Sequence, residues 1–176
     1  MIRVIVGLGN PGEPYTDTYH NIGMDFVEAV VSGPWKRAPR KHFVYAEKDG
    51  VSWIKPLVFM NESGSAVQEA AAYFKKGPDE LLVIHDDSDL PWGTHKMAFD
   101  SGTAGHKGVA SIIDALGTKA FWRLRVGIRP KADLPAEARR AKAGEFVLRK
   151  LSSGHKKERR ALFKKLMEVL RRAREL

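Results

Sequence analysis

MIRVIVGLGNPG, residues 1–12, opens the chain and decides its fold class. Ile2–Leu8 is a nearly continuous apolar run, interrupted only by Arg3, and such a run is typical of a buried strand. Gly9–Gly12 then ends the strand with residues that strongly favour a turn. The chain is therefore expected to start with a buried strand that leaves the sheet through a glycine-rich loop.

Helix and strand patterns alternate along the rest of the chain. Apolar residues recur at helical spacing over residues 21–31, 61–74, 107–116 and 155–176, with Asn61 as an expected helix cap. Further strands are expected over residues 43–46, 51–54, 81–84 and 122–128, the last with Arg123 and Arg125 on a basic face. A Pro- and Ala-rich connection is expected over residues 130–143. We predict an α/β fold: a single three-layer domain over residues 1–176, with a mixed, mostly parallel sheet and helices on both faces.

Composition limits the possible functions. The 176 residues contain no cysteine, which excludes disulfides, thiolate metal sites and cysteine nucleophiles. No run approaches the ~18 apolar residues of a membrane span and no signal peptide is evident, so a cytoplasmic location without a membrane partner is expected. The net charge is +9, and residues 155–176 hold nine Lys and Arg against three Glu. This surplus favours a polyanionic partner, although a solubilising surface explains the charge equally well.

The glycine-rich loop satisfies the G-x-G-x-x-G pattern of dinucleotide-binding folds. In those folds a helix begins inside the motif, whereas Pro11, Pro14 and a polar run delay the first helix here to about residue 21. No second strand ending in an acidic residue follows at the distance required for ribose binding. A plain turn, or a turn that projects Asn10 over the carboxyl end of the strand, fits better than a nucleotide site.

His20 and Asp86 are the candidate acid–base residues. Asp86 directly follows the expected strand over residues 81–84, and His20 precedes the first expected helix. Because the carboxyl ends of neighbouring parallel strands meet at one edge of a sheet, Asn10, His20 and Asp86 could lie close together. A carboxylate on one imidazole nitrogen leaves the other free to take a proton from water. A separation beyond hydrogen-bonding or one-water reach would argue for a purely structural histidine.

Other kinds of site fit less well. His85–Asp89 has metal-ligand residue types, but it lacks both calcium-loop and H-E-x-x-H spacing, and no metal is expected. No two glycines stand four positions apart, so a G-x-S-x-G nucleophile elbow cannot occur. Interleaved basic and aromatic residues suit single-stranded RNA, which leaves a non-enzymatic RNA-binding domain as an alternative. These residues are Tyr15, Phe59, Trp92, Lys96, Lys107, Arg123, Arg125 and Arg129.

Five blocks of the sequence match, in order, the pattern of one known family. Together they resemble the bacterial peptidyl-tRNA hydrolases, over a span from Met1 to about Leu148. Five ordered blocks are a far more specific signal than a lone glycine pattern. The blocks are residues 6–12 followed by Tyr15 and His20–Gly23, then Lys55–Gly64, His85–Gly93, Gly105–Gly108 and Arg123–Ile128.

The resemblance implies an enzyme that hydrolyses the ester between a peptide and the 3′ ribose of tRNA, which recycles tRNA during translation. It implies that His20 activates water, that Asp86 supports the basic form of His20, and that Asn10 acts beside them. It also implies substrate contacts from Asn61, Tyr15 and Phe59, and contact between Arg125 and the tRNA 5′ phosphate. The family uses one mixed α/β domain, is usually monomeric, and needs no metal or cofactor.

Three positions depart from the family pattern. Val58 stands where Thr is usual before Phe59, which removes a hydroxyl group. Lys107 stands where Asn is usual, and an ammonium group donates hydrogen bonds but accepts none. Ala98 stands where a basic residue is usual two positions after Lys96, so Lys96 and Lys107 are expected to compensate in holding the phosphates of the substrate. The basic C-terminal helix has no clear counterpart in the family.

Overall fold

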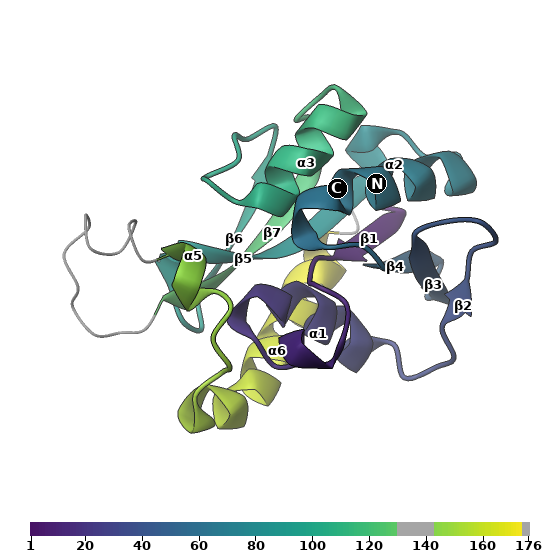
Figure 1. Ribbon diagram of the computed structural model, residues 1–176. Helices are drawn as coiled ribbons and strands as arrows, with labels where there is room; N and C mark the ends of the chain where they lie inside the picture. Colours follow the sequence, from purple (N-terminus) through teal and green to yellow (C-terminus); the bar gives the residue numbers. More distant parts are fainter. Residues whose placement is uncertain (130–142, 174–176) are drawn as a thin grey trace.

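One seven-stranded sheet runs through the middle of the molecule (Figure 1). The computed structural model describes residues 1–129 and 143–173, and the strand order is β2-β3-β4-β1-β5-β7-β6. β1 pairs in parallel with β4 and β5, and β5 pairs in parallel with β7, whereas β3 and β6 run antiparallel to their neighbours. The predicted mixed, mostly parallel sheet is confirmed. The strands are β1 Val4–Gly7, β2 Lys36–Arg37, β3 Phe43–Lys48, β4 Val51–Pro56, β5 Leu81–Pro91, β6 His95–Phe99 and β7 Trp122–Arg129.

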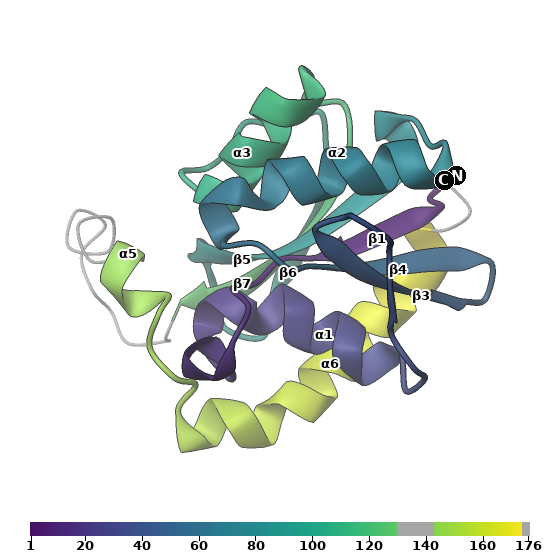
Figure 2. The same ribbon diagram turned by 45° about the vertical axis from the view of Figure 1, so that its right-hand side comes forward.

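Helices cover both faces of the sheet, so the predicted three layers are present (Figure 2). α2 (Ser63–Phe74) and α3 (Lys107–Leu116) pack on one face, and α1 (Ile22–Val30) and α6 (Ser153–Ala173) pack on the other. α5 (Ala143–Phe146) precedes α6. Among the described residues, no helix combines the length and apolar character needed to cross a bilayer. Short 3-10 helices are η1 Glu13–Tyr15, η2 Tyr19–Asn21, η3 Met60–Glu62 and η4 Pro78–Glu80.

The first strand lies between the two cores. Val4 and Val6 pack toward α2 and α3, while Ile5 packs toward α1 and α6, and all three side chains are fully buried. α1 lies directly against β1 and β5, because a Cβ added to Gly23 would stand 2.2 Å from the carbonyl oxygen of Ile84. Glycine at this position lets the backbones touch, and the close contact carries η2, with His20, to the edge of the sheet.

Several predicted boundaries were wrong. β5 does not end at Ile84 but continues to Pro91, because β7 pairs with it through Asp87 and again at Pro91. β2 and β6 were not expected, since Lys36–Arg37 is very short and His95–Phe99 lacks a clear apolar alternation. Asn61 does not cap α2, because residues 60–62 form η3. The expected connection over residues 130–143 and the end of the C-terminal helix lie largely outside the described residues.

The basic face predicted for β7 was also wrong in part. Arg123 is only 1% exposed, since the face it shares with Arg125 is covered by the layer that contains α3. Both Nη atoms of Arg123 are buried without a hydrogen-bond partner among the described residues. Burial, and then the positive charge of Arg125, lower the pKa of the Arg123 guanidinium. Arg123 is therefore an interior residue rather than part of a solvated surface.

Candidate active site

A cleft of about 460 Å³ opens beyond the end of β1 and beside residues 85–88 of β5. It collects seven of the nine side chains predicted from the sequence, and the other two, Arg125 and Lys96, do not line it. Residues of the chain after α5 close one side of the cleft, including Val147 and Leu148. The seven residues are Asn10, Tyr15, His20, Phe59, Asn61, Asp86 and Lys107.

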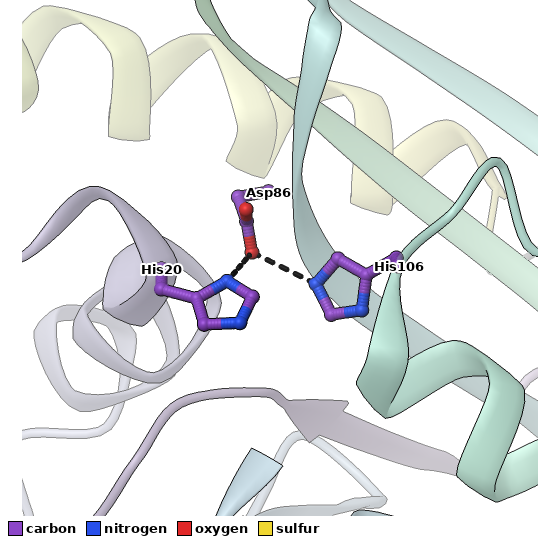
Figure 3. Close-up of side chains that lie close together, drawn as sticks. All are labelled: His20, Asp86 and His106. Carbon is purple, nitrogen blue, oxygen red and sulfur yellow. Dashed lines mark hydrogen bonds and ion pairs between the residues drawn. The ribbon is translucent and has the colours of Figure 1, made fainter. Parts of the chain in front are cut away.

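His20 and Asp86 form a direct hydrogen bond at the base of this cleft (Figure 3). The His20 Nδ1 atom lies 2.8 Å from Asp86 Oδ1, and the His20 side chain is 11% exposed. An ionised carboxylate only accepts hydrogen bonds, so Nδ1 carries the proton and donates it. Nε2 of His20 is then the unprotonated nitrogen, which is the form that a general base requires.

A second histidine, His106, bonds the same carboxylate oxygen (Figure 3). Its Nε2 atom lies 2.9 Å from Asp86 Oδ1, while its Nδ1 accepts the backbone N–H groups of Gly108 and Val109 at the start of α3. Because Nδ1 accepts, Nε2 must donate, and both rings therefore direct an N–H at one oxygen. His106 caps α3 and fixes the position of Asp86 at the same time.

The charge on Asp86 is stabilised by these two rings. Burial by itself raises the pKa of Asp86, but His20 and His106 outweigh burial and hold the pKa well below its usual range. Beneath them, His85 donates from Nδ1 to the carbonyl of Asp86 at 2.7 Å and packs edge-on against His106. Burial and the nearby His106 lower the pKa of His85 well below its usual value, so His85 is neutral. Asp86 is thus an ionised carboxylate that accepts hydrogen bonds from His20 and His106.

His20, Asp86 and His106 are also residue types that bind metal ions, and their ligand atoms lie within 4.8 Å of one another. Two nitrogen or oxygen ligands on one tetrahedral zinc ion stand about 3.3 Å apart. The 2.8 and 2.9 Å separations seen here are shorter and match hydrogen bonds instead. In this arrangement the cluster fits a hydrogen-bonded acid–base group better than a metal site.

Two hydrogen bonds between the Asn21 side chain and the Asn10 backbone hold Asn10 over the cleft. The Asn21 side chain accepts the backbone N–H of Asn10 at 2.8 Å and donates to its carbonyl at 2.9 Å. The side-chain oxygen of Asn10 accepts the backbone N–H of Met60 at 2.7 Å. Because its oxygen is engaged, Asn10 presents its Nδ2 amide as a donor. The turn after β1 therefore projects Asn10 over the carboxyl end of the strand, which was one of the two interpretations of the glycine-rich loop.

The segment that carries His20 is tied to the chain that follows α5. The backbone N–H of His20 donates to the carbonyl of Val147 at 2.8 Å, and that of Tyr19 donates to Arg149 at 3.1 Å. Leu151 returns a backbone bond to Asp17. Nothing in the local sequence of residues 15–21 predicts these partners, which stand more than 120 positions away.

Aromatic side chains line one wall of the cleft. Phe59 is 49% exposed, and its ring lies edge-on to that of Tyr15 at 5.9 Å. Trp92, in contrast, was wrongly expected to offer a stacking surface. It is buried, its ring stacks on His155 at 4.1 Å, and its Nε1 donates to Glu158. Trp92 anchors the start of α6 and does not face the cleft.

Arg125 and Lys96 lie beside the cleft rather than in it. They stand opposite each other in the antiparallel pairing of β6 with β7. Arg125 is connected to the cleft through Asp87, whose Oδ2 accepts from Arg125 Nε, and Asp87 is itself a cleft residue. The two cations therefore border the cleft on the side of β7.

Sequence reasoning missed two residues of this site. His106 stands in a Gly105–Gly108 block that was recognised without assigning His106 a role, and Asn21 was treated as part of a helix. The available signal was that both residues stand inside blocks that match the family. A histidine with one nitrogen on a buried carboxylate and the other unprotonated in a cleft is typical of hydrolytic enzymes that activate water.

Comparison with known proteins agrees with this class. The peptidyl-tRNA hydrolase family model matches residues 4–175. A peptidyl-tRNA hydrolase of Marinobacter nauticus is 40% identical over 179 residues, which cover 96% of this chain and 87% of that protein. One of Teredinibacter turnerae is 47% identical over 137 residues, or 72% of this chain and 70% of that protein.

Solved structures show the same fold. A crystal structure of peptidyl-tRNA hydrolase from Acinetobacter baumannii has a TM-score of 0.79 and 28% identity, and covers 93% of this chain and 83% of that one. Fold, cleft and comparisons together define a hydrolase of the ester-cleaving class. The chain belongs to the peptidyl-tRNA hydrolase family.

Proposed function

We propose that this protein hydrolyses the ester bond between the peptide and the 3′ ribose of peptidyl-tRNA, with His20 as the general base. The observation that carries the proposal is the 2.8 Å bond between His20 Nδ1 and Asp86, which leaves Nε2 unprotonated. Water at Nε2 loses a proton to the ring as it attacks the ester carbonyl. Asp86, already ionised, stabilises the imidazolium that forms.

The amide groups of the cleft complete the reaction. Asn10 offers an Nδ2 donor because Met60 occupies its oxygen, and this donor stabilises the oxyanion that develops on the carbonyl. Asn61 holds the peptide next to the ester, and Tyr15 and Phe59 form the apolar wall against it. No step requires a metal or a cofactor, because the base, its support and the oxyanion donor are all side chains of this chain.

The cations place the tRNA part of the substrate. Lys107 lies in the cleft, where it contacts the phosphates of the single-stranded 3′ end. Arg125, with Lys96 opposite it, contacts the 5′ phosphate, which lies at the same end of a tRNA. We also propose that the protein acts as a monomer in the cytoplasm, where peptidyl-tRNA arises during translation.

His20→Ala tests the proposal in an assay of peptide release from N-acetyl-aminoacyl-tRNA. General-base catalysis is worth about 10²–10⁴-fold, so kcat should fall by that factor while tRNA affinity stays nearly unchanged. His42→Ala is the matched control, because His42 is exposed and bonds Glu69 outside the cleft. Near-normal turnover by His20→Ala would refute the assignment, and equal losses in both variants would point to a folding defect.

A further inference from the structure

Asp87 joins the cleft to Arg125 through a fixed set of contacts. Its Oδ2 accepts from Arg125 Nε, and its Oδ1 accepts the backbone N–H of Asp89 at 2.9 Å. The Asp87 side chain is 4% exposed and that of Arg125 is 16% exposed. Both carboxylate oxygens are therefore engaged, and Asp87 is a rigid support for the guanidinium.

Two other cations stand close to Arg125. Lys96 stands directly opposite it on β6, and Arg123 lies two positions earlier on the same face of β7. Like charges at these positions repel the guanidinium, whereas Asp87 attracts it. With Nε held by Asp87, the Nη edge has no partner among the described residues, and a bidentate edge is what a phosphate recognises.

Asp87 is also the residue next to Asp86. Asp86 bonds His20 and His106, whereas Asp87 bonds Arg125 on the neighbouring strand β7. One peptide unit, about 3.8 Å between Cα atoms, thus separates the support of the base from the support of the guanidinium. The middle of β5 therefore carries both the carboxylate that supports the base and the carboxylate that supports the guanidinium.

We propose that Asp87 is a positioning residue that orients Arg125 toward the terminal phosphate monoester of the tRNA, so that the strength of the preference for this phosphate depends on Asp87. This inference rests on the proposed function. Asp87 acts through Arg125 and touches no reacting atom. Its loss frees a flexible side chain that must then be ordered on binding, a cost equivalent to roughly three- to tenfold in affinity.

The test compares N-acetyl-aminoacyl-tRNA bearing a 5′ phosphate with the same substrate bearing a 5′ hydroxyl. The readout is the ratio of their KM values for wild type, Asp87→Asn, Asp87→Glu and Asp89→Asn. Asp87→Asn should reduce the preference for the phosphate roughly three- to tenfold, with kcat on the 5′-hydroxyl substrate nearly unchanged. Asp87→Glu retains a carboxylate and should restore most of the preference. Asp89→Asn makes the same change of charge two positions away on an exposed side chain, and should have no effect.

The sign of the change separates the possible roles. A carboxylate that acted only by its charge would repel a phosphate dianion more than a hydroxyl, so Asp87→Asn would raise the preference and overturn the proposal. A purely structural role would impair both substrates equally and leave the ratio unchanged, which also overturns it. If wild type hydrolyses both substrates through His20 but shows no preference, this inference fails while the proposed function stands. If Asp87→Asn fails to fold, the ratio for Asp87→Glu decides. This variant should keep most of the preference but lose a measurable part, because its carboxylate is displaced by one methylene. A ratio equal to that of wild type would refute positioning.

Discussion

Asp86→Asn is the substitution that isolates the charge of the buried carboxylate. In wild type, His20 Nδ1 and His106 Nε2 both donate to the same oxygen, Oδ1, at 2.8 and 2.9 Å. An asparagine oxygen at that position accepts from both rings, so the geometry and the tautomer of His20 are retained. What disappears is the negative charge that faces the imidazolium of the transition state.

The size of the loss follows from the separation of the charges. Two unit charges about 4 Å apart at an effective dielectric constant of about 20 interact by about 4 kcal/mol. At 1.36 kcal/mol per tenfold change in rate, this is at most about 10³-fold. Because the neutral amide still offers its dipole to the ring, we expect kcat to fall by about 10²- to 10³-fold. KM should change little, since the charge on His20 develops after the substrate is bound.

The assay is single-turnover hydrolysis of N-acetyl-aminoacyl-tRNA at saturating enzyme, which reports the chemical step directly. Asp89→Asn is again the control for the loss of one negative charge near the end of β5. Unfolding midpoints of the variants show whether the interior has collapsed. A kcat for Asp86→Asn within about fivefold of wild type, in a folded protein, would refute the view that the carboxylate stabilises the imidazolium.

Two further substitutions test other features of the molecule. Lys107→Asn removes one cation from the cleft, so the slope of log KM against log salt concentration should fall by about 0.7. The kcat value should change less than tenfold. An unaltered slope would show that Lys107 does not contact the phosphates. Asp25→Asn tests a carboxyl whose pKa burial raises from 3.8 to about 6 despite the neighbouring Arg159. The folded state then holds a proton that the unfolded state loses, so wild-type stability falls as pH rises from about 4 to 6 and is level above. Asn removes this penalty and should raise the free energy of unfolding by up to about 3 kcal/mol at pH 8 but little at pH 4. Chemical denaturation at both pH values measures it, and a pH-independent difference would contradict the reasoning.

The sequence predicted the elements whose patterns are locally complete. Ile2–Leu8 and Lys107–Leu116 satisfy strand and helix rules without help from distant residues. β6 and the second half of β5 are strands only because β7 lies between them. Their polar residues, such as His85–Asp87, are buried by tertiary packing, which no local pattern encodes.

The site was predictable to the extent that topology alone brings its residues together. β1 and β5 are parallel neighbours, so the meeting of Asn10 and Asp86 follows from strand order, as the sequence argument assumed. The roles of His106 and Asn21 were not predicted, because they depend on which ring nitrogen or amide atom already has a hydrogen-bond partner. Asn21 was expected only to be part of a helix, yet its side chain forms hydrogen bonds with both the N–H and the carbonyl of the Asn10 backbone. Such roles require atomic positions rather than residue types.

The arrangement at the end of β5 also explains why this region tolerates so many buried polar groups. An isolated buried carboxylate is costly, but Asp86 has two imidazole donors and Asp87 has a guanidinium and a backbone N–H. Each anion thus has two hydrogen-bond donors from this chain. Because β7 pairs with β5 at both Asp86 and Asp87, the backbone that carries the two carboxylates is held in the sheet. This pairing fixes the two carboxylates relative to each other, and with them the side chains of His20 and Arg125 that they bond.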